Sequence, residues 1–160
     1  MGTNSGDNYG LPSQAQSREF DCHRLFDRHD EQRLEVFVIY TDSPGTLAAL
    51  QMADKLARRL EAHIGLLMPY EVPYTLPLTK PAAPVEFLEG QLRNLACSTG
   101  LEIAVHIYLC RDKRRTLGLI LRQHSLTVVG GKKRWWPTSA QKLAQDLQKA
   151  GHHVIFAELR

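Results

Sequence analysis

The chain of 160 residues has few cysteines and no long hydrophobic run. Cys22, Cys97 and Cys110 lie far apart and form no C-x-x-C pair, which argues against a disulfide framework and indicates a reducing compartment. No apolar run reaches the roughly 18 residues that a transmembrane helix needs, so we expect no membrane insertion. Residues 1–17 are polar and lack the apolar core of a secretory signal. These absences predict a cytoplasmic protein.

The motifs that mark common catalytic and cofactor sites are also missing. The chain has no G-x-S-x-G elbow, no Walker lysine motif and no dinucleotide G-x-G-x-x-G. Its seven histidines form no metal-binding pattern. Cys97 lies among apolar residues and is expected in the core, whereas Cys110 beside Arg111 is a candidate for a lowered thiol pKa. Because no nucleophile is accompanied by a base and an orienting group, we expect neither catalysis nor a metal site.

What is present is a regular alternation of strand and helix patterns after residue 33. Short β-branched or apolar runs predict strands at 35–41, 63–68, 102–109, 126–129 and 153–159. Leucine and alanine at helical spacing predict helices near 45–62, 85–96, 117–121 and 140–150. This order predicts one α/β domain over residues 34–160, with an open five-stranded parallel sheet and helices on both of its faces.

Charge separates an acidic arm from a basic stretch. Residues 1–33 carry four Lys or Arg against six Asp or Glu, and we expect a flexible arm, or a short docking helix within 18–33. Residues 111–134 carry eight Lys or Arg against one Asp. This stretch either forms a solvated face or attracts the phosphates of a ligand, a nucleic acid or a membrane surface. Four of its cations begin a predicted helix, where they oppose the helix dipole and call for an anion or an acidic partner.

A ligand site is expected where the order of the strands reverses, beyond their carboxyl ends. If the order is 3-2-1-4-5, the reversal lies between the first and fourth strands. Glycines there let a backbone approach a phosphate, and the start of a helix favours an anion, although an ordinary strand-to-helix turn is the alternative. The candidate nucleotide-binding residues at this point are Thr41, Asp42, Ser43, Gly130, Gly131, Lys132, Lys133, Thr138 and Ser139.

With these features in place, residues 34–159 resemble the universal stress protein family. The resemblance rests on the strand end at 40–43, the proline-rich loop after the second strand, the strand end at 128–131, and a final helix and strand. It implies the strand order 3-2-1-4-5, a homodimer through the last strand and, in many members, bound ATP. It also implies that Asp42 and Met68 lie beside the adenine, with Gly130, Gly131 and Ser139 near the phosphates.

The chain departs from the family's phosphate-loop pattern, which is glycine, two residues, glycine, nine residues, then glycine followed by Ser or Thr. Gly130 matches the first glycine, but Lys133 stands at the second, and the loop to Thr138 is short. Lysine adopts positive φ less readily than glycine. We therefore expect a degenerate nucleotide site without a cofactor. An ATP- or other adenine-nucleotide-binding regulator is the alternative, with Lys132 and Lys133 supplying charge.

Two features outside the family pattern predict contacts with other molecules. Trp135 and Trp136 follow Arg134, and tryptophan beside basic residues is typical of interface hot spots and base-stacking platforms, unless the two rings pack on the domain. Val154 and Phe156 alternate along the last strand, whose edge suits pairing with a second copy. We predict a non-catalytic regulatory or accessory protein that dimerises and binds a protein partner or joins a larger assembly. A nucleic-acid-binding module is the other alternative, although a net charge of +3 argues against it.

Overall fold

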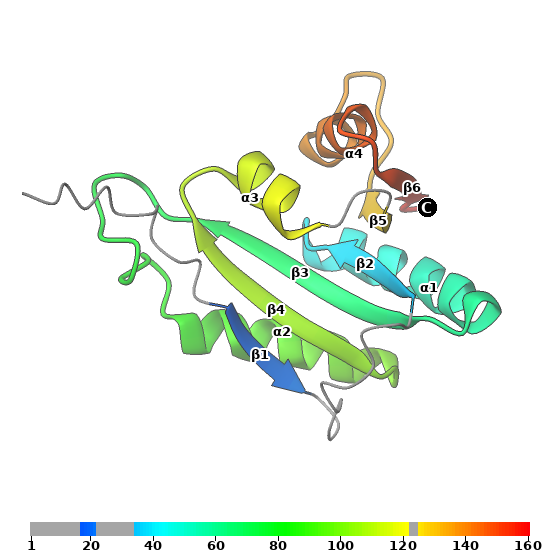
Figure 1. Ribbon diagram of the computed structural model, residues 1–160, viewed down its shortest axis with the longest axis horizontal. Helices are drawn as coiled ribbons and strands as arrows, with labels where there is room; N and C mark the ends of the chain where they lie inside the picture. The colour runs from blue at the N-terminus through cyan, green and yellow to red at the C-terminus, as the bar shows by residue number, and fades with distance from the viewer. Residues whose placement is uncertain (1–16, 22–33, 122–124) are drawn as a thin grey trace, which may run out of the picture.

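The computed structural model describes residues 17–21, 34–121 and 125–160 of the chain. Within these residues one six-stranded sheet has the order β1-β4-β3-β2-β5-β6 (Figure 1). Its parallel strands are β2 (Glu35–Ile39), β3 (His63–Glu71), β4 (Ile103–Cys110), β5 (Leu126–Gly131) and β6 (His153–Glu158). The predicted five-stranded parallel sheet with the order 3-2-1-4-5 is therefore confirmed.

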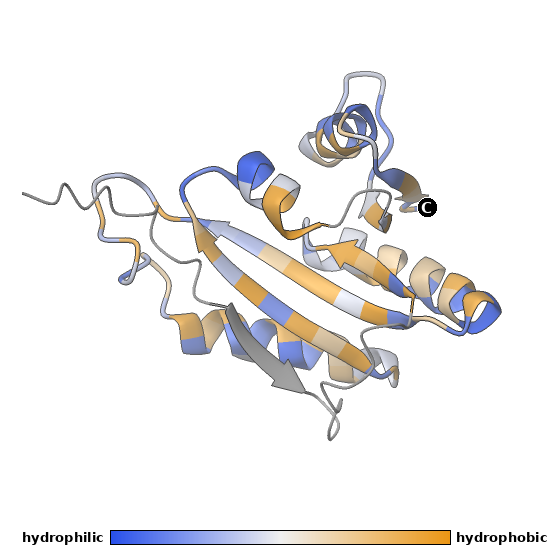
Figure 2. Cartoon of the chain, in the orientation of Figure 1, coloured by the Kyte–Doolittle hydropathy of each residue, from blue (hydrophilic) through white to orange (hydrophobic). Residues whose placement is uncertain are grey.

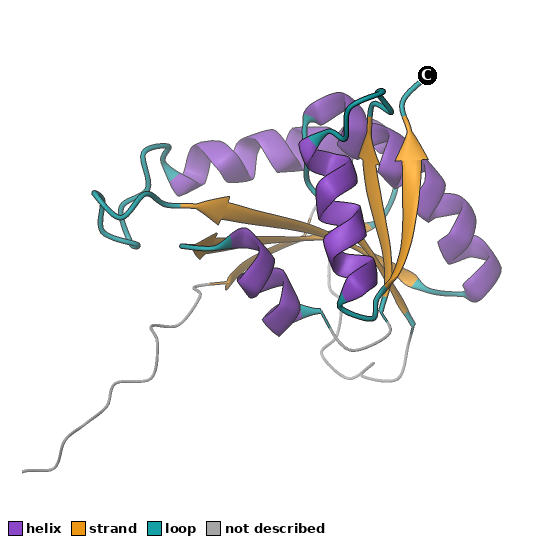
Figure 3. Cartoon of the chain, turned by 90° about the horizontal axis from the view of Figure 1, so that it is seen from above, coloured by secondary structure: helices purple, strands orange, loops and turns teal. Residues whose placement is uncertain are grey.

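Helices of the described residues cover both faces of this sheet. α1 (Ser43–Leu60) and α2 (Val85–Thr99) lie on one face, and α3 (Lys113–Ile120) and α4 (Ser139–Lys149) lie on the other (Figures 1 and 3). The central strands are apolar over much of their length, whereas the helices mix apolar and polar residues (Figure 2). This is the pattern expected of strands buried on both faces and helices buried on one.

The sheet divides the apolar core into two clusters. Successive residues of a strand point to opposite faces, so Val38 packs toward α1 and α2 while Ile39 packs toward α3 and α4. Leu66 and Leu67 divide in the same way on β3. All four side chains are at most 1% exposed. This packing on both faces fixes the carboxyl ends of β2 and β3 and so positions the segments that follow them.

The structure differs from the expected flexible arm or docking helix at the start of the chain. Ser17–Asp21 form β1, which pairs antiparallel with residues 104–108 of β4. β1 covers the outer edge of β4, where unpaired backbone N–H and C=O groups would otherwise invite pairing with another chain. The other residues of the predicted arm, 1–16 and 22–33, lie outside the described part of the chain.

β3 passes through Pro69, although the sequence predicted that a loop begins there. The Leu67 carbonyl accepts a 2.8 Å hydrogen bond from the Tyr40 N–H, on the side of β3 that faces β2. Pro69, two residues on, faces the same side, but β2 ends at Ile39. Its missing N–H therefore costs no ladder hydrogen bond, and the strand continues to Glu71.

The carboxyl end of β5 lies in backbone contact with the first turn of α1. A Cβ built on Gly130 would stand 1.8 Å from the carbonyl oxygen of Gly45, and one built on Gly45 would stand 2.7 Å from that of Gly130. The Thr41 hydroxyl adds a 2.8 Å hydrogen bond to the Gly130 carbonyl. Glycine is needed at both positions because the helix and the strand approach too closely for any side chain.

We expect Gly130→Ala to lower the free energy of unfolding by at least about 2 kcal/mol, because overpacking costs about 1–3 kcal/mol and this methyl would meet backbone. Chemical denaturation measures the change. Gly90→Ala on α2 is the control, since no atom lies within 4 Å of the added Cβ. This control should be neutral or stabilising by up to about 1 kcal/mol. Equal stabilities of the two variants would contradict the packing argument.

Candidate functional site

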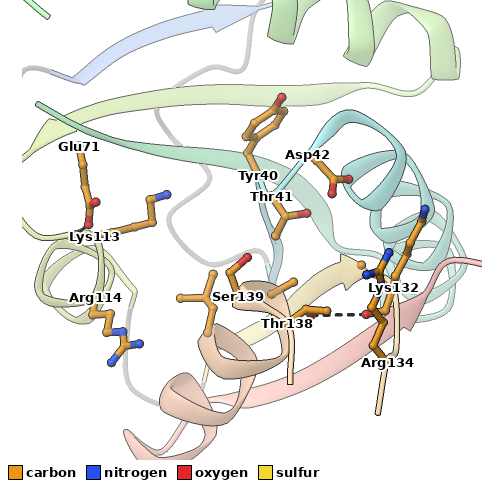
Figure 4. A pocket seen from close by; sticks show the side chains of 13 residues that line it. Tyr40, Thr41, Asp42, Glu71, Lys113, Arg114, Lys132, Arg134, Thr138 and Ser139 are labelled. Atoms are coloured by element: carbon orange, nitrogen blue, oxygen red, sulfur yellow. Dashed lines mark hydrogen bonds between the residues drawn. The ribbon is translucent and has the colours of Figure 1, made fainter. Parts of the chain in front are cut away.

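A cavity of about 530 Å³ lies beyond the carboxyl ends of β2 and β5, where the strand order reverses (Figure 4). It opens on the face of the sheet that carries α3 and α4. The lining residues are Tyr40, Thr41, Asp42, Glu71, Lys113, Arg114, Gly131, Lys132, Arg134, Thr138, Ser139, Ala140 and Leu143. The structure therefore places a hollow at the position that the strand order predicts for a ligand.

The structure brings six of the predicted nucleotide-binding residues to this cavity. They come from the segment after β2 and from the segment between β5 and α4. The six are Thr41, Asp42, Gly131, Lys132, Thr138 and Ser139. The two segments meet because β2 and β5 are neighbours in the sheet although they are far apart in the sequence.

The other four predicted residues do not line the cavity. Ser43 begins α1 and is exposed. Met68 is 7% exposed and belongs to the core cluster under α1 and α2, on the opposite face of the sheet. The backbone of α1 packs against Gly130, and Lys133 lines a separate groove between α4 and β6. The positions that the family resemblance implied for adenine contact are thus only partly present at the cavity.

The helix starts beside the cavity use their own side chains as caps. The Asp42 carboxylate accepts a 2.6 Å hydrogen bond from the Gly45 N–H at the start of α1. At the start of α4, Thr138 and Gln141 form a reciprocal capping box, in which each side chain accepts from the other's backbone N–H. Part of the anion-binding capacity expected of the α4 N-terminus is therefore satisfied within the helix.

Basic side chains border the cavity from two sides (Figure 4). Lys113 and Arg114 come from α3, and Lys132 and Arg134 come from the segment after β5. The sequence did not predict that these two groups border one cavity, because β4 and β5 are separated in the sheet by β3 and β2. They border the same cavity because α3, which connects β4 to β5, packs against β3 and α4. Sequence patterning detected the basic stretch but carried no signal for this juxtaposition.

Arg111, the first cation of the basic stretch, is engaged with the proline-rich loop. Its guanidinium donates 2.9 Å hydrogen bonds to the carbonyls of Val72 and Leu76, and a further one to Pro73. The guanidinium carbon also stands 5.1 Å from the centre of the Tyr74 ring. Arg111 therefore positions the loop and is not directed to a ligand.

Carboxylates of the chain compensate part of the remaining basic charge. Arg114 pairs with Asp146 of α4 at 3.0 Å, and the backbone N–H of Lys113 donates to the Glu71 carboxylate at 2.9 Å. Asp146 and Glu71 thus supply acidic partners at the α3 start, whereas the candidates in the arm, Asp27, Asp30 and Glu31, lie outside the described residues. Within the described residues, by contrast, no carboxylate forms an ion pair with the side chains of Lys113, Lys132 or Arg134. These three cations leave the cavity with a positive charge.

The segment 132–137, here called the tryptophan loop, borders a second hollow. A groove of about 270 Å³ between α4 and β6 is lined by Lys133, Phe156 and Glu158, among others. Lys133 thus faces the groove while its neighbours Lys132 and Arg134 face the cavity. Trp135 and Trp136 are 93% and 80% exposed, so the alternative in which both rings pack on the domain is wrong.

β6 is the outer strand of the sheet beside this groove. The backbone N–H groups of His153 and Leu159 donate toward β5, so the N–H and C=O groups of Val154, Phe156 and Glu158 point away from the sheet. The side chains of Val154 and Phe156, predicted to meet a second copy, pack partly against the core cluster under α3 and α4. The Val154 carbonyl accepts a 3.4 Å hydrogen bond from the Gln148 side chain, so the edge available for pairing consists of the other outward backbone groups.

The two cysteines of the described residues differ in exposure. Cys97 is exposed, so its predicted place in the core is wrong. Burial raises the pKa of the Cys110 thiol, which contradicts the lowered value expected beside Arg111.

Within 17–21, 34–121 and 125–160, no cluster of three His, Cys, Asp or Glu side chains is placed to bind a metal. No helix in those ranges has the length and apolar character of a membrane span.

Comparison of the chain with protein-family models finds no match, and neither the curated proteins nor the solved structures contain a match. The universal stress protein resemblance therefore stays a prediction, and the fold itself rests on the strand order and helix placement described above.

In a Cys22→Ser background, we expect Cys97 to react with a maleimide at neutral pH at least about tenfold faster than Cys110. Cys97 is exposed, whereas burial keeps Cys110 in the unreactive thiol form. Time-resolved mass spectrometry of the intact protein and its peptides measures both rates. The Cys110 rate should rise as the pH increases toward its raised pKa. Faster labelling of Cys110 at neutral pH would contradict the assigned burial.

Proposed function

We propose that the chain is a non-catalytic regulatory or accessory protein of the universal stress protein kind, which acts through dimerisation and partner binding and whose nucleotide site is degenerate. The observation that carries the proposal is the near-complete exposure of Trp135 and Trp136 on a loop at the predicted ligand edge. Large apolar side chains held in water are typical of surfaces that bind another molecule.

The structural roles of Gly130, Met68 and the α4 start support a degenerate nucleotide site. Gly130 is explained by its backbone contact with α1, and the capping box at Thr138 already satisfies part of the α4 start. Met68, the residue implied to contact adenine, is buried on the other face of the sheet. The features that would hold an adenine nucleotide in the family's usual manner thus have structural explanations that need no nucleotide.

The outer edge of β6 supports dimerisation. Val154, Phe156 and Glu158 direct backbone groups away from the sheet. The Val154 carbonyl accepts from the Gln148 side chain, and no strand of the described residues pairs with the remaining groups. A second copy related by a two-fold axis offers the same row of donors and acceptors. Antiparallel pairing of the two β6 strands would join the two sheets into one and remove both edges.

We expect sedimentation equilibrium to show a dimer that Glu158→Pro weakens at least severalfold, because proline removes an outward N–H worth about 1 kcal/mol. Glu158→Ala, which keeps that N–H, is the matched control and should leave the dissociation constant nearly unchanged. A protein that stays monomeric over the accessible concentrations would overturn dimerisation through β6.

The cavity favours a second candidate function, the binding of a compact phosphate-bearing ligand. Lys113, Lys132 and Arg134 border it without carboxylate partners among the described residues, and the Ser139 hydroxyl lies between them, whereas the Thr41 hydroxyl donates to the Gly130 carbonyl (Figure 4). Cations and hydroxyls that converge from different elements are suited to phosphate oxygens. An adenine-nucleotide-binding regulator is the more specific form of this candidate.

We expect pyrophosphate at 100 times its dissociation constant to stabilise the protein by about 2.7 kcal/mol, measured from thermal unfolding. Lys132→Ala with Arg134→Ala should remove most of this gain, whereas Lys55→Ala on the outer side of α1 should leave it unchanged. ATP should stabilise no more than pyrophosphate if the adenine site is degenerate. A larger effect of ATP would favour the nucleotide regulator, and no effect of either ligand would overturn this candidate.

A further inference from the structure

The tryptophan loop presents apolar and basic groups together at one projecting point. Figure 1 shows the segment between β5 and α4 extending beyond α4. Trp135 and Trp136 stand almost fully in solvent there, and neither ring belongs to a core cluster. Lys132, Lys133 and Arg134 precede them directly and are also exposed. The loop therefore combines two large amphipathic rings with three cations.

Several acidic residues near this edge of the sheet are already engaged, and Glu158, which lines the α4–β6 groove with Lys133, forms no ion pair with it. Asp42 and Asp112 cap α1 and α3 through hydrogen bonds to backbone N–H groups. Asp146 pairs with Arg114. The carboxylates thus offset helix starts and one arginine, and they leave the cations of the tryptophan loop without an ion-pair partner among the described residues. A ligand that meets this loop meets a positive field.

The position of the two rings discriminates between classes of partner. Single-stranded nucleic acid is usually held in a basic groove whose aromatic side chains stack on the bases. Neither Trp135 nor Trp136 lines the cavity or the α4–β6 groove. A protein interface of standard size covers about 800 Å² on each partner around an apolar centre, whereas the apolar surface here is confined to two side chains. Tryptophan with flanking cations on a projecting loop is instead the composition of a lipid-interface anchor.

We infer that the tryptophan loop docks the protein on an anionic lipid surface. The indole rings would lie at the level of the headgroups, where an apolar body and a polar N–H are both satisfied. Lys133, which lies outside the cavity, would lie against the lipid phosphates, where a cation adds to the attraction. The inference rests on the proposed function, because it names the partner of the same exposed loop. It requires only surface docking, without a spanning segment.

The experiment uses the full chain with vesicles of phosphatidylcholine, with and without phosphatidylglycerol. Trp135 and Trp136 are the only tryptophans, so intrinsic fluorescence reports on the loop directly. We expect a blue shift and co-sedimentation with the anionic vesicles only, with binding that weakens as salt is added. Lys133→Gln should weaken binding about fivefold, whereas Lys55→Gln on α1 should not change it. Trp135→Ser with Trp136→Ser should abolish co-sedimentation while leaving thermal unfolding unchanged.

Several outcomes would overturn the inference. They are failure to bind anionic vesicles, equal binding to neutral vesicles, or binding that survives the double tryptophan substitution. A blue shift with single-stranded DNA but not with vesicles would assign the loop to nucleic acid instead. Measuring the oligomeric state in the same experiment distinguishes failure of the lipid inference from failure of the proposed dimerisation. A dimer that does not bind vesicles refutes the lipid partner and leaves dimerisation standing. A monomer that binds anionic vesicles supports the lipid partner and refutes dimerisation.

Discussion

The close approach of α1 to β5 is the constraint on which the ligand edge of this protein depends. The first turn of the helix meets the strand backbone at Gly45 and Gly130, and the Thr41 hydroxyl joins the two segments by a hydrogen bond. Because these segments are far apart in the sequence, this contact sets where β2 and β5 end relative to each other. The cavity, the capped start of α4 and the tryptophan loop all take their positions from those two strand ends.

The short connection from β5 to α4 places the residues of one segment in three environments. Lys132 and Arg134 border the cavity, Lys133 borders the α4–β6 groove, and the tryptophans extend into solvent. The capping box at Thr138 holds one end of this loop, and the Thr138 hydroxyl also donates to the Lys132 carbonyl at 3.4 Å. The hydrogen bond joins the two ends of the loop, and the two tryptophans between them are exposed.

The basic charge of the chain serves two different purposes. At the start of α3 much of it is internal, since Arg111 holds the proline-rich loop through three carbonyls and Arg114 pairs with α4. These contacts supply the compensation that cations at a helix N-terminus require. The cations after β5 have no such carboxylate partner within the described residues, so they are the ones available to an external anion.

Hydrophobic periodicity by itself determined the α/β class, the alternation of elements and most of their bounds, because burial patterns along a strand or helix are local. The order of the strands came from the family resemblance, and the sheet confirms it. Only the tertiary structure decided that Gly130 serves packing, that Met68 faces away from the cavity, and that Lys113 and Lys132 border the same cavity. It also added β1 at the edge of β4. Each of these depends on which distant segments lie side by side, and that is a property of long-range packing that no local pattern encodes.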